Sequence, residues 1–274
     1  MALDERKLAF IGAGHITNVI VDNLAKAEKV YTHRLIASDP VKEKLQRLYD
    51  EYEIVMADSN PDAVDKGDFI FINVLPQIVG EVIDELSAGR FPEDKLIITL
   101  AAGIPINAYE RLGENVAVVR ALPNPPSQIG KGISALAFNP HVTEKQKADV
   151  FALFASLGEF VVLNEDNINA VMALSSPVAT YLFFQSLIDA GIRAGIDRQT
   201  ATKVVYQTIL GALEVWRQRQ VPPHGLLSEA ATPGGISAES IFTLEQYAFR
   251  AALNDAINRA VVKAEEFADD IQKT

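Results

Sequence analysis

Residues 8–17 read LAFIGAGHIT, an apolar run that ends at Gly12, turns through Gly14 and enters a segment with helical spacing. A strand, a glycine turn and a helix in that order are typical of dinucleotide-binding folds, because glycines let the backbone approach a pyrophosphate at the helix N-terminus. Thr17 stands where the third glycine of that pattern falls. Asp39 follows roughly 20 residues on, where an acidic residue usually hydrogen-bonds the adenosine ribose. The stretch therefore predicts binding of NAD or NADP.

The alternation of strand and helix continues through the first part of the chain. Apolar runs typical of strands lie at 7–12, 34–38, 53–57, 68–75, 95–100 and 115–120, with helical patterns at 41–52 and 79–86. This order predicts an α/β fold with a doubly wound parallel sheet. Two edge strands, at 133–138 and 159–163, are expected around a helix at 143–157.

The pattern becomes entirely helical from about residue 165. A stripe from Val205 to Trp216 follows helical spacing, and the helices are interrupted at Pro222-Pro223 and again at Pro233-Gly234-Gly235. We therefore expect a Rossmann-type dinucleotide-binding domain over 1–164 and an all-helical domain over 165–274. Trp216 and Phe183-Phe184 are expected to be core aromatics.

Composition excludes several classes of protein. The chain has 274 residues, with 36 acidic against 25 basic residues and a formal net charge of −11, so it offers no basic surface for nucleic acid. It has no cysteine, which excludes disulfides, thiolate nucleophiles and zinc ribbons. Residues 167–188 carry no charge, but their polar side chains and Pro177 favour a buried helix over a membrane span. We expect a soluble, cytoplasmic protein with no membrane partner.

Loops after the later strands should face the cofactor, because ligands of open α/β sheets bind at the carboxyl ends of the strands. These loops are Val74–Pro76, Ala101–Gly103 and Arg120–Pro125, and their composition alone would also fit plain turns. The choice between NAD and NADP stays open. Ser38 would accommodate a 2′-phosphate, whereas Asp39 would repel one.

The residue patterns of common hydrolases and metal enzymes are missing from the sequence. The histidines are His15, His33, His141 and His224, none of them paired at metal-ligand spacing. The sequence also lacks a G-x-S-x-G elbow and a P-loop lysine. We expect no bound metal.

Three segments together resemble the pyrroline-5-carboxylate reductase family. They are FIGAGHIT at 10–17, VVRALPNPPSQIGKGISAL at 118–136 and ATPGGISAESIFTLEQYAFRAALNDAI at 231–257. The family reduces the cyclic imine Δ1-pyrroline-5-carboxylate to proline with NAD(P)H. It combines a Rossmann domain with a helical domain that interlocks with a second subunit, and its dimers often assemble into larger rings. The resemblance implies the same for this chain.

The resemblance also implies roles for individual residues. The pyrophosphate would lie against Gly12, Gly14, His15 and Ile16, and the adenosine side against Ser38, Asp39 and Asn60. The nicotinamide half would contact Val74, Pro76, Ala101 and Ala102. The substrate would be bound by Pro123, Asn124, Ser175, Ser176, Gly234, Gly235, Ile236 and Ser237. Ser237, as the catalytic residue, matches the family's threonine hydroxyl near the imine nitrogen. A protonated imine is already electrophilic, so positioning it should supply much of the rate.

The sequence departs from the family at the substrate loop. The family's S-G-S-G-P-A-Y is here Ser175-Ser176-Pro177-Val178-Ala179-Thr180-Tyr181. A β-branched valine resists the backbone conformations that glycine allows, so substrate binding should be altered. Leu75 replaces a lysine of the family near the cofactor, and Gln220 an acidic residue.

Three functions remain open on these residues. The first is reduction of Δ1-pyrroline-5-carboxylate itself, the second is reduction of a different cyclic imine or a bulkier keto or imino substrate, and the third is dinucleotide binding without catalysis. A β-hydroxyacid dehydrogenase would need a lysine early in the helical domain, and 167–192 contains none. The apolar helical part has more hydrophobic surface than a small bundle buries, so we expect a homodimer.

Overall fold

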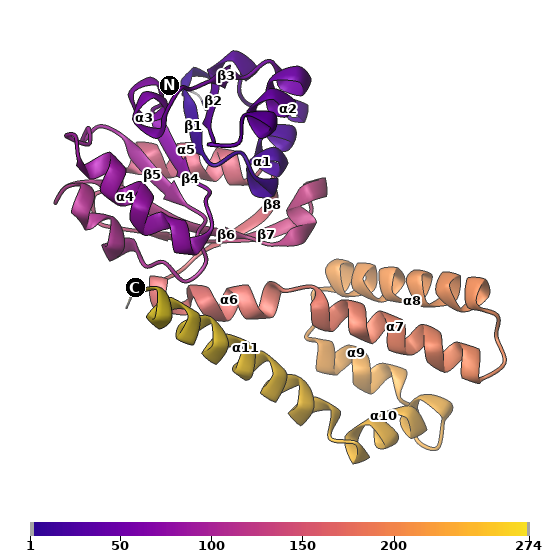
Figure 1. Ribbon diagram of the computed structural model, residues 1–274. Coiled ribbons are helices and arrows are strands. Elements are labelled where there is room, and N and C mark those ends of the chain that lie inside the picture. The colour runs from indigo at the N-terminus through magenta and orange to yellow at the C-terminus, as the bar shows by residue number, and fades with distance from the viewer. Residues whose placement is uncertain (1–2, 273–274) are drawn as a thin grey trace. The chain divides into compact units, whose positions relative to one another are not determined.

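The computed structural model describes residues 3–272, which form two compact units. The sheet unit runs to Ser175 and includes the chain from Asn258 onward, and the helical unit runs from Ser176 to Ile257 (Figure 1). The division falls later than the predicted boundary at 164, because the short helix α6 (Ile168–Ser175) packs on the sheet through the fully buried Ile168. The boundary at 164 stays a prediction.

The sheet unit contains an eight-stranded sheet in the order β3-β2-β1-β4-β5-β6-β7-β8. The strands are β1 (Leu8–Ile11), β2 (Leu35–Ser38), β3 (Val55–Met56), β4 (Phe69–Ile72), β5 (Leu96–Thr99), β6 (Ala117–Pro123), β7 (Gly132–Phe138) and β8 (Gly158–Val162). β1, β2, β4 and β5 are buried along their whole length, as strands covered on both faces must be. Order reverses beside β1, which places the switch point of the sheet at the glycine turn.

Helices cover both faces of this sheet, so the prediction of a doubly wound Rossmann-type fold is confirmed (Figure 1). The helices of the sheet unit are α1 (His15–Lys26), α2 (Lys42–Tyr52), α3 (Asn60–Lys66), α4 (Val79–Ser87), α5 (Glu144–Phe154) and α6. Apolar residues of α1, α2 and α5 form one core cluster, and those of α3, α4 and α6 form the other.

The structure adds one feature that the alternation of strands and helices does not predict. β6 and β7 are antiparallel, and β8 is parallel to β7, whereas the first six strands are mutually parallel. The connection from β6 to β7 is short and contains only the 3₁₀ helix η5 (Pro125–Ile129). A parallel connection needs a crossover of a dozen or more residues, so this short link forces the reversal.

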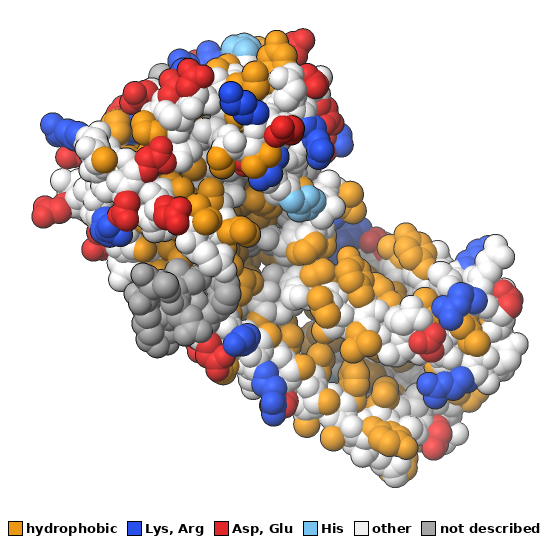
Figure 2. Space-filling model, in the orientation of Figure 1, with side chains coloured by type: hydrophobic (Ala, Val, Ile, Leu, Met, Phe, Trp, Pro, Cys, Tyr) orange, Lys and Arg blue, Asp and Glu red, His pale blue; other side chains and the backbone are white. Residues whose placement is uncertain are grey.

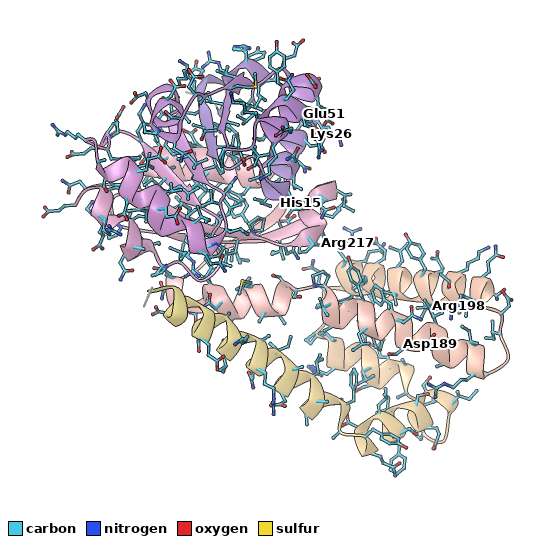
Figure 3. The ribbon with its side chains drawn as sticks, viewed as in Figure 1. His15, Lys26, Glu51, Asp189, Arg198 and Arg217 are labelled. Atoms are coloured by element: carbon cyan, nitrogen blue, oxygen red, sulfur yellow. The ribbon has the colours of Figure 1, made fainter. Side chains whose placement is uncertain are left out.

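The helical unit has almost no core of its own. Its helices are α7 (Val178–Arg193), α8 (Arg198–Arg219), α9 (Pro223–Ala230), α10 (Ile236–Gln246) and the first part of α11 (Phe249–Gln272), which belongs to the sheet unit from Asn258 onward. Gly191 of α7 lies close to Ala201 of α8, and Asp189 lies near Arg198, at 3.9 Å between Oδ1 and Nη2 (Figure 3). Ala201 is the one buried residue among the described residues of α7 to α10.

Large apolar side chains are instead spread over the surface of the helical unit (Figure 2). Leu182 is 67% exposed. Trp216 and Phe183 are also exposed, so the prediction that they are core aromatics is wrong for the single chain. The physical reason is that the helices of this unit bury almost none of their apolar side chains against one another, so those side chains have no partner in the single chain.

One stretch, Glu165–Arg193, is long and apolar enough by length and composition to cross a membrane. In the structure it is interrupted at Ser176-Pro177, between α6 and α7. The sixteen residues of α7 extend about 24 Å, which is short of a bilayer's apolar thickness.

Candidate functional site

The glycine turn after β1 is fixed by the neighbouring strand and by Thr17. Gly12 has a φ of +99°, and a Cβ there would lie 2.8 Å from the carbonyl oxygen of Asn73, so only glycine fits. The buried Thr17 hydroxyl donates to the Gly12 carbonyl at 2.5 Å and accepts from Asn73 Nδ2 at 3.0 Å. Thr17 thereby joins α1 to the ends of β1 and β4, where the usual motif has a third glycine.

Gly14 differs from Gly12 because no contact within the protein requires a glycine at this position. It caps α1 in an extended conformation, no described side chain caps the helix in its place, and a Cβ on Gly14 would meet no atom within 4 Å. The first amides of a helix have no partner within the helix, so they are free to bind an anion. The open position beside these amides fits the pyrophosphate of a dinucleotide.

The Asp39 carboxylate is turned inward and braces this turn. Oδ2 accepts from the Ala13 amide and Oδ1 from the Val41 amide, both at 2.9 Å. The side chain is 5% exposed, with Lys44 Nζ 3.4 Å from Oδ2. Asp39 therefore holds the end of β2 against the glycine turn, which is a structural task besides the ribose contact predicted for it.

Ser38 and Asn60, both predicted on the adenosine side, do lie together. Ser38 Oγ donates to Asn60 Oδ1 at 2.7 Å, and Asn60 Nδ2 donates to Glu85 Oε2 at 2.6 Å. Glu85 comes from α4, and sequence reasoning missed it. Charged residues are common on helix surfaces, so nothing in the sequence marks Glu85.

The loops predicted for the nicotinamide half are held by buried contacts. Val74 lies beside Gly12, because its Cγ1 would be 3.2 Å from a Cβ added to Gly12. The Ala101 amide donates to Thr99 Oγ1 at 3.3 Å, and that oxygen is 2.5 Å from the hydroxyl of Tyr109. Burial raises the pKa of Tyr109, so it remains a neutral phenol. Sequence reasoning missed Tyr109, which lies in the 3₁₀ segment Ile106–Leu112 (η4).

Pro76 and Ala102 belong to the same two loops. Pro76 begins the 3₁₀ turn Pro76–Ile78 (η3), directly after the exposed Leu75. Ala102 follows the buried Ala101 and is only partly exposed. Both lie past the carboxyl ends of their strands, where they were predicted.

A pocket lies between the start of α1 and η5. Its volume is about 150 Å³, and it is lined by His15, Ile16, Val19, Pro123, Asn124, Pro125, Ser127 and Gln128. The His15 ring, at the first position of α1, has its Nε2 3.2 Å from Gln128 Nε2 (Figure 3). Residues predicted for the cofactor and for the substrate thus meet in one pocket of the sheet unit.

The remaining predicted substrate residues are divided between the two units. Pro123, Asn124 and Ser175 belong to the sheet unit, where Asn124 Nδ2 donates to the Ser175 carbonyl at 2.9 Å. The residues that the structure places in the helical unit are Ser176, Gly234, Gly235, Ile236 and Ser237. Gly234 has a φ of +74° and Gly235 caps α10, so Ile236 and Ser237 lie exposed in its first turn.

Comparison with known proteins identifies the family. Residues 165–267 match the model described as pyrroline-5-carboxylate reductase dimerisation, and residues 7–103 match the one described as NADP oxidoreductase coenzyme F420-dependent. The pyrroline-5-carboxylate reductase of Pseudomonas aeruginosa is 32% identical over 97% of this chain and 98% of its own length. The chain belongs to the pyrroline-5-carboxylate reductase family. The corresponding Escherichia coli enzyme is 29% identical over 96% of this chain and 98% of its own length.

Solved structures of pyrroline-5-carboxylate reductases have the same fold. The Plasmodium falciparum enzyme, solved with NADP bound, superposes with a TM-score of 0.86 at 27% identity and covers 97% of this chain and 99% of its own. The Coxiella burnetii enzyme superposes with a TM-score of 0.87 at 26% identity, and the match covers 95% of this chain and 98% of that enzyme. Both units of the chain are therefore those of a pyrroline-5-carboxylate reductase.

Proposed function

We propose that this protein reduces Δ1-pyrroline-5-carboxylate to L-proline with NADPH. The observation that carries the proposal is the similarity to pyrroline-5-carboxylate reductases over nearly the whole chain, which includes both the glycine turn and the Pro-Gly-Gly segment. The open position at Gly14 and the uncapped start of α1 support dinucleotide binding independently.

NADPH, when bound, supplies a hydride to the carbon of the imine. The pyrophosphate would be held by the turn and first amides of α1, at Gly12, Gly14, His15 and Ile16. Ser38 and Asn60 would bind the adenosine side, with Asp39 bracing the turn behind them. The nicotinamide half would lie against Val74, Pro76, Ala101 and Ala102, past the carboxyl ends of β4 and β5.

The imine needs little acid–base chemistry from the chain, because its protonated form is already electrophilic. Ser237, in the first turn of α10, would hydrogen-bond the imine nitrogen and hold its proton there. The Ile236 and Ser237 amides, in the first turn of α10 after Gly235, would bind the carboxylate. Pro123, Asn124, Ser175 and Ser176 would complete the substrate site.

We infer that the active form is a homodimer in the cytoplasm. The family model that covers 165–267 is that of a dimerisation domain. The apolar side chains exposed on α7 and α8 need a partner surface, and a second copy of the same helices would cover them. A ring of such dimers is the larger assembly that the family resemblance implies.

A second substrate class is favoured by one observation. Ser176 and Val178 stand where the family has glycines, and Val178 is exposed at the start of α7. The larger side chains change the shape of the loop and make it more apolar, so a different cyclic imine or a bulkier keto or imino substrate is the alternative. A six-membered cyclic imine is the simplest probe of it.

The test is NAD(P)H oxidation with five- and six-membered cyclic imines, comparing Ser237→Ala with Ser240→Ala. Ser240 lies one turn further along α10 and donates to the Ile236 carbonyl, so it is the matched control. Loss of the hydrogen bond from Ser237 should lower kcat/KM about 10- to 100-fold, and Ser240→Ala should leave it unchanged. Equal rates for both variants would remove Ser237 from the mechanism. Faster turnover of the six-membered imine would establish the alternative substrate.

A further inference from the structure

Both polar atoms of the Asn124 side chain form hydrogen bonds within the protein. Its Nδ2 donates to the Ser175 carbonyl at 2.9 Å, and its Oδ1 accepts from the Ile133 amide at 2.8 Å. Asn124 is the first residue after β6, and Ile133 lies opposite it on β7. The two bonds fix the orientation of the amide group and tie the end of α6 to the β6–β7 pair.

The start of α6 is tied to the same strand. Arg120 of β6 has a side chain only 5% exposed, and its Nη1 lies 3.2 Å from Glu165 Oε1. Its Nη2 donates to Asn169 Oδ1 at 3.1 Å. The same oxygen of Glu165 accepts from the Ile106 amide at 2.8 Å. Burial lowers the pKa of Arg120 and Glu165 opposes that shift, so the guanidinium stays charged beside its partner.

Helix α6 is therefore held at its start by Arg120 of β6 and at its end by Asn124, directly after β6. It has only eight residues and ends at Ser175, the last residue of the sheet unit before the chain passes into the helical unit. The segment that begins there, Ser175–Tyr181, is the one that the resemblance assigns to the substrate. Since a short helix moves as one piece, its two ties set where this segment begins.

We propose that Asn124 is a positioning residue, which fixes the substrate segment Ser175–Tyr181 through the Ser175 carbonyl. This inference rests on the proposed function for the identity of the substrate. It assigns to Asn124 a task different from direct contact with the imine. Experiment can separate the two tasks. If Asn124 acts by holding α6, substitutions at the other end of α6 should change substrate binding as well, whereas direct contact with the imine would involve Asn124 alone.

The first experiment compares Asn124→Leu with Asn139→Leu in the full-length protein. Leucine has nearly the shape of asparagine and adds no charge. Asn139 is a matched control at the opposite end of the β6–β7 pair: its Oδ1 accepts from Val118 and its Nδ2 donates to Val116. Asn124→Leu should raise the KM for the imine about 3- to 10-fold, the range for a lost hydrogen bond, and leave the KM for NADPH unchanged. Asn139→Leu should change neither KM.

The second experiment tests the coupling through α6. Asn169→Ala removes a half-exposed partner of Arg120 at the start of the helix, and the variant should fold normally. If both residues act through α6, the double variant with Asn124→Leu should raise the imine KM by less than the product of the two single effects. A product of independent effects, or no effect of Asn169→Ala, would overturn the proposal in favour of direct substrate contact.

Amide hydrogen exchange gives a readout that does not depend on turnover. Peptides covering α6 and Ser176–Tyr181 should exchange about tenfold faster in Asn124→Leu than in the wild-type protein or Asn139→Leu. Unchanged exchange would overturn the positioning role even if the imine KM rises. Absence of imine turnover by the wild-type protein would overturn the proposed function instead, and the exchange measurement would still decide the role of Asn124 in holding the segment.

Discussion

Two glycines of the same turn are required for different reasons. Gly12 is demanded by the fold, because its positive φ and the nearby Asn73 carbonyl leave no room for a Cβ. Gly14 has no protein atom within 4 Å of its Cβ position, so a side chain there meets only what binds to the turn. Sequence alone does not separate the two, because both belong to one motif.

A substitution at Gly14 should therefore remove cofactor binding without unfolding the protein. Gly14→Val should weaken NADPH binding about 100-fold or more, equivalent to about 2.7 kcal/mol, because its side chain occupies the pyrophosphate position. Its melting temperature without cofactor should stay close to that of the wild-type protein. Binding is measured by the fluorescence of NADPH. Unchanged affinity would show that the cofactor does not lie at this turn.

The glycine turn between β1 and α1 could be predicted from the sequence, since a strand–turn–helix motif has characteristic residue types and spacing, whereas the other cofactor residues come from the family resemblance and stay predictions. Ser38 and Asn60, both predicted on the adenosine side, lie within hydrogen-bonding distance of each other. The supporting residues could not be predicted. Glu85 and Tyr109 support the site through side-chain hydrogen bonds to Asn60 and Thr99, and nothing in their local sequence marks them.

At the scale of elements, β8 depends on a close approach between two glycines. Gly158 pairs with Gly132 of β7, and a Cβ on Gly158 would lie 2.2 Å from the Gly132 carbonyl oxygen. Its φ of +132° adds backbone strain for any other residue. The start of this edge strand therefore admits only glycine.

Gly158→Ala should lower the free energy of unfolding by about 2–4 kcal/mol, because steric overlap and backbone strain add. The control is Gly80→Ala in α4, where a Cβ would meet nothing within 4 Å and alanine should stabilise the helix by up to about 1 kcal/mol. Both are measured by urea unfolding at equal protein concentration. A stability of Gly158→Ala equal to that of Gly80→Ala would mean that β8 does not pair with β7 in this register.

Each of the eight strands overlaps the apolar run that predicted it, but two details of the prediction are wrong. β6 continues to Pro123, so residues 120–123 belong to the strand and not to the loop after it, and β7 lies between β6 and β8 instead of at an edge. The reversal of β7 was not predicted, because periodicity reports burial and does not report direction. It follows from the length of the link between β6 and β7, in which η5 leaves no room for a crossover helix.

At the scale of the whole molecule, the helical unit cannot be stable alone. Its described helices bury almost nothing, and large apolar side chains cover its surface (Figure 2). Such a surface is typical of an obligate subunit interface. The sequence predicted a partner from the excess of apolar residues, but it could not show which residues lie exposed.

We expect a dimer by size-exclusion chromatography with light scattering at micromolar concentration. Leu182→Asp, at a side chain 67% exposed in the single chain, should abolish the dimer, because an unpaired charge in an apolar interface costs several kcal/mol. Tyr31→Asp is the control, at a side chain 63% exposed in the sheet unit. A monomeric wild-type protein with a stable helical unit would contradict the dimer.

The most direct test of the account is hydride transfer to the imine carbon. The protein is incubated with Δ1-pyrroline-5-carboxylate and NADPH that carries deuterium at both C4 positions, and the product is analysed by mass spectrometry and NMR. The account predicts L-proline with a single deuterium at C5. Tight binding of NADPH with no labelled proline formed would contradict it.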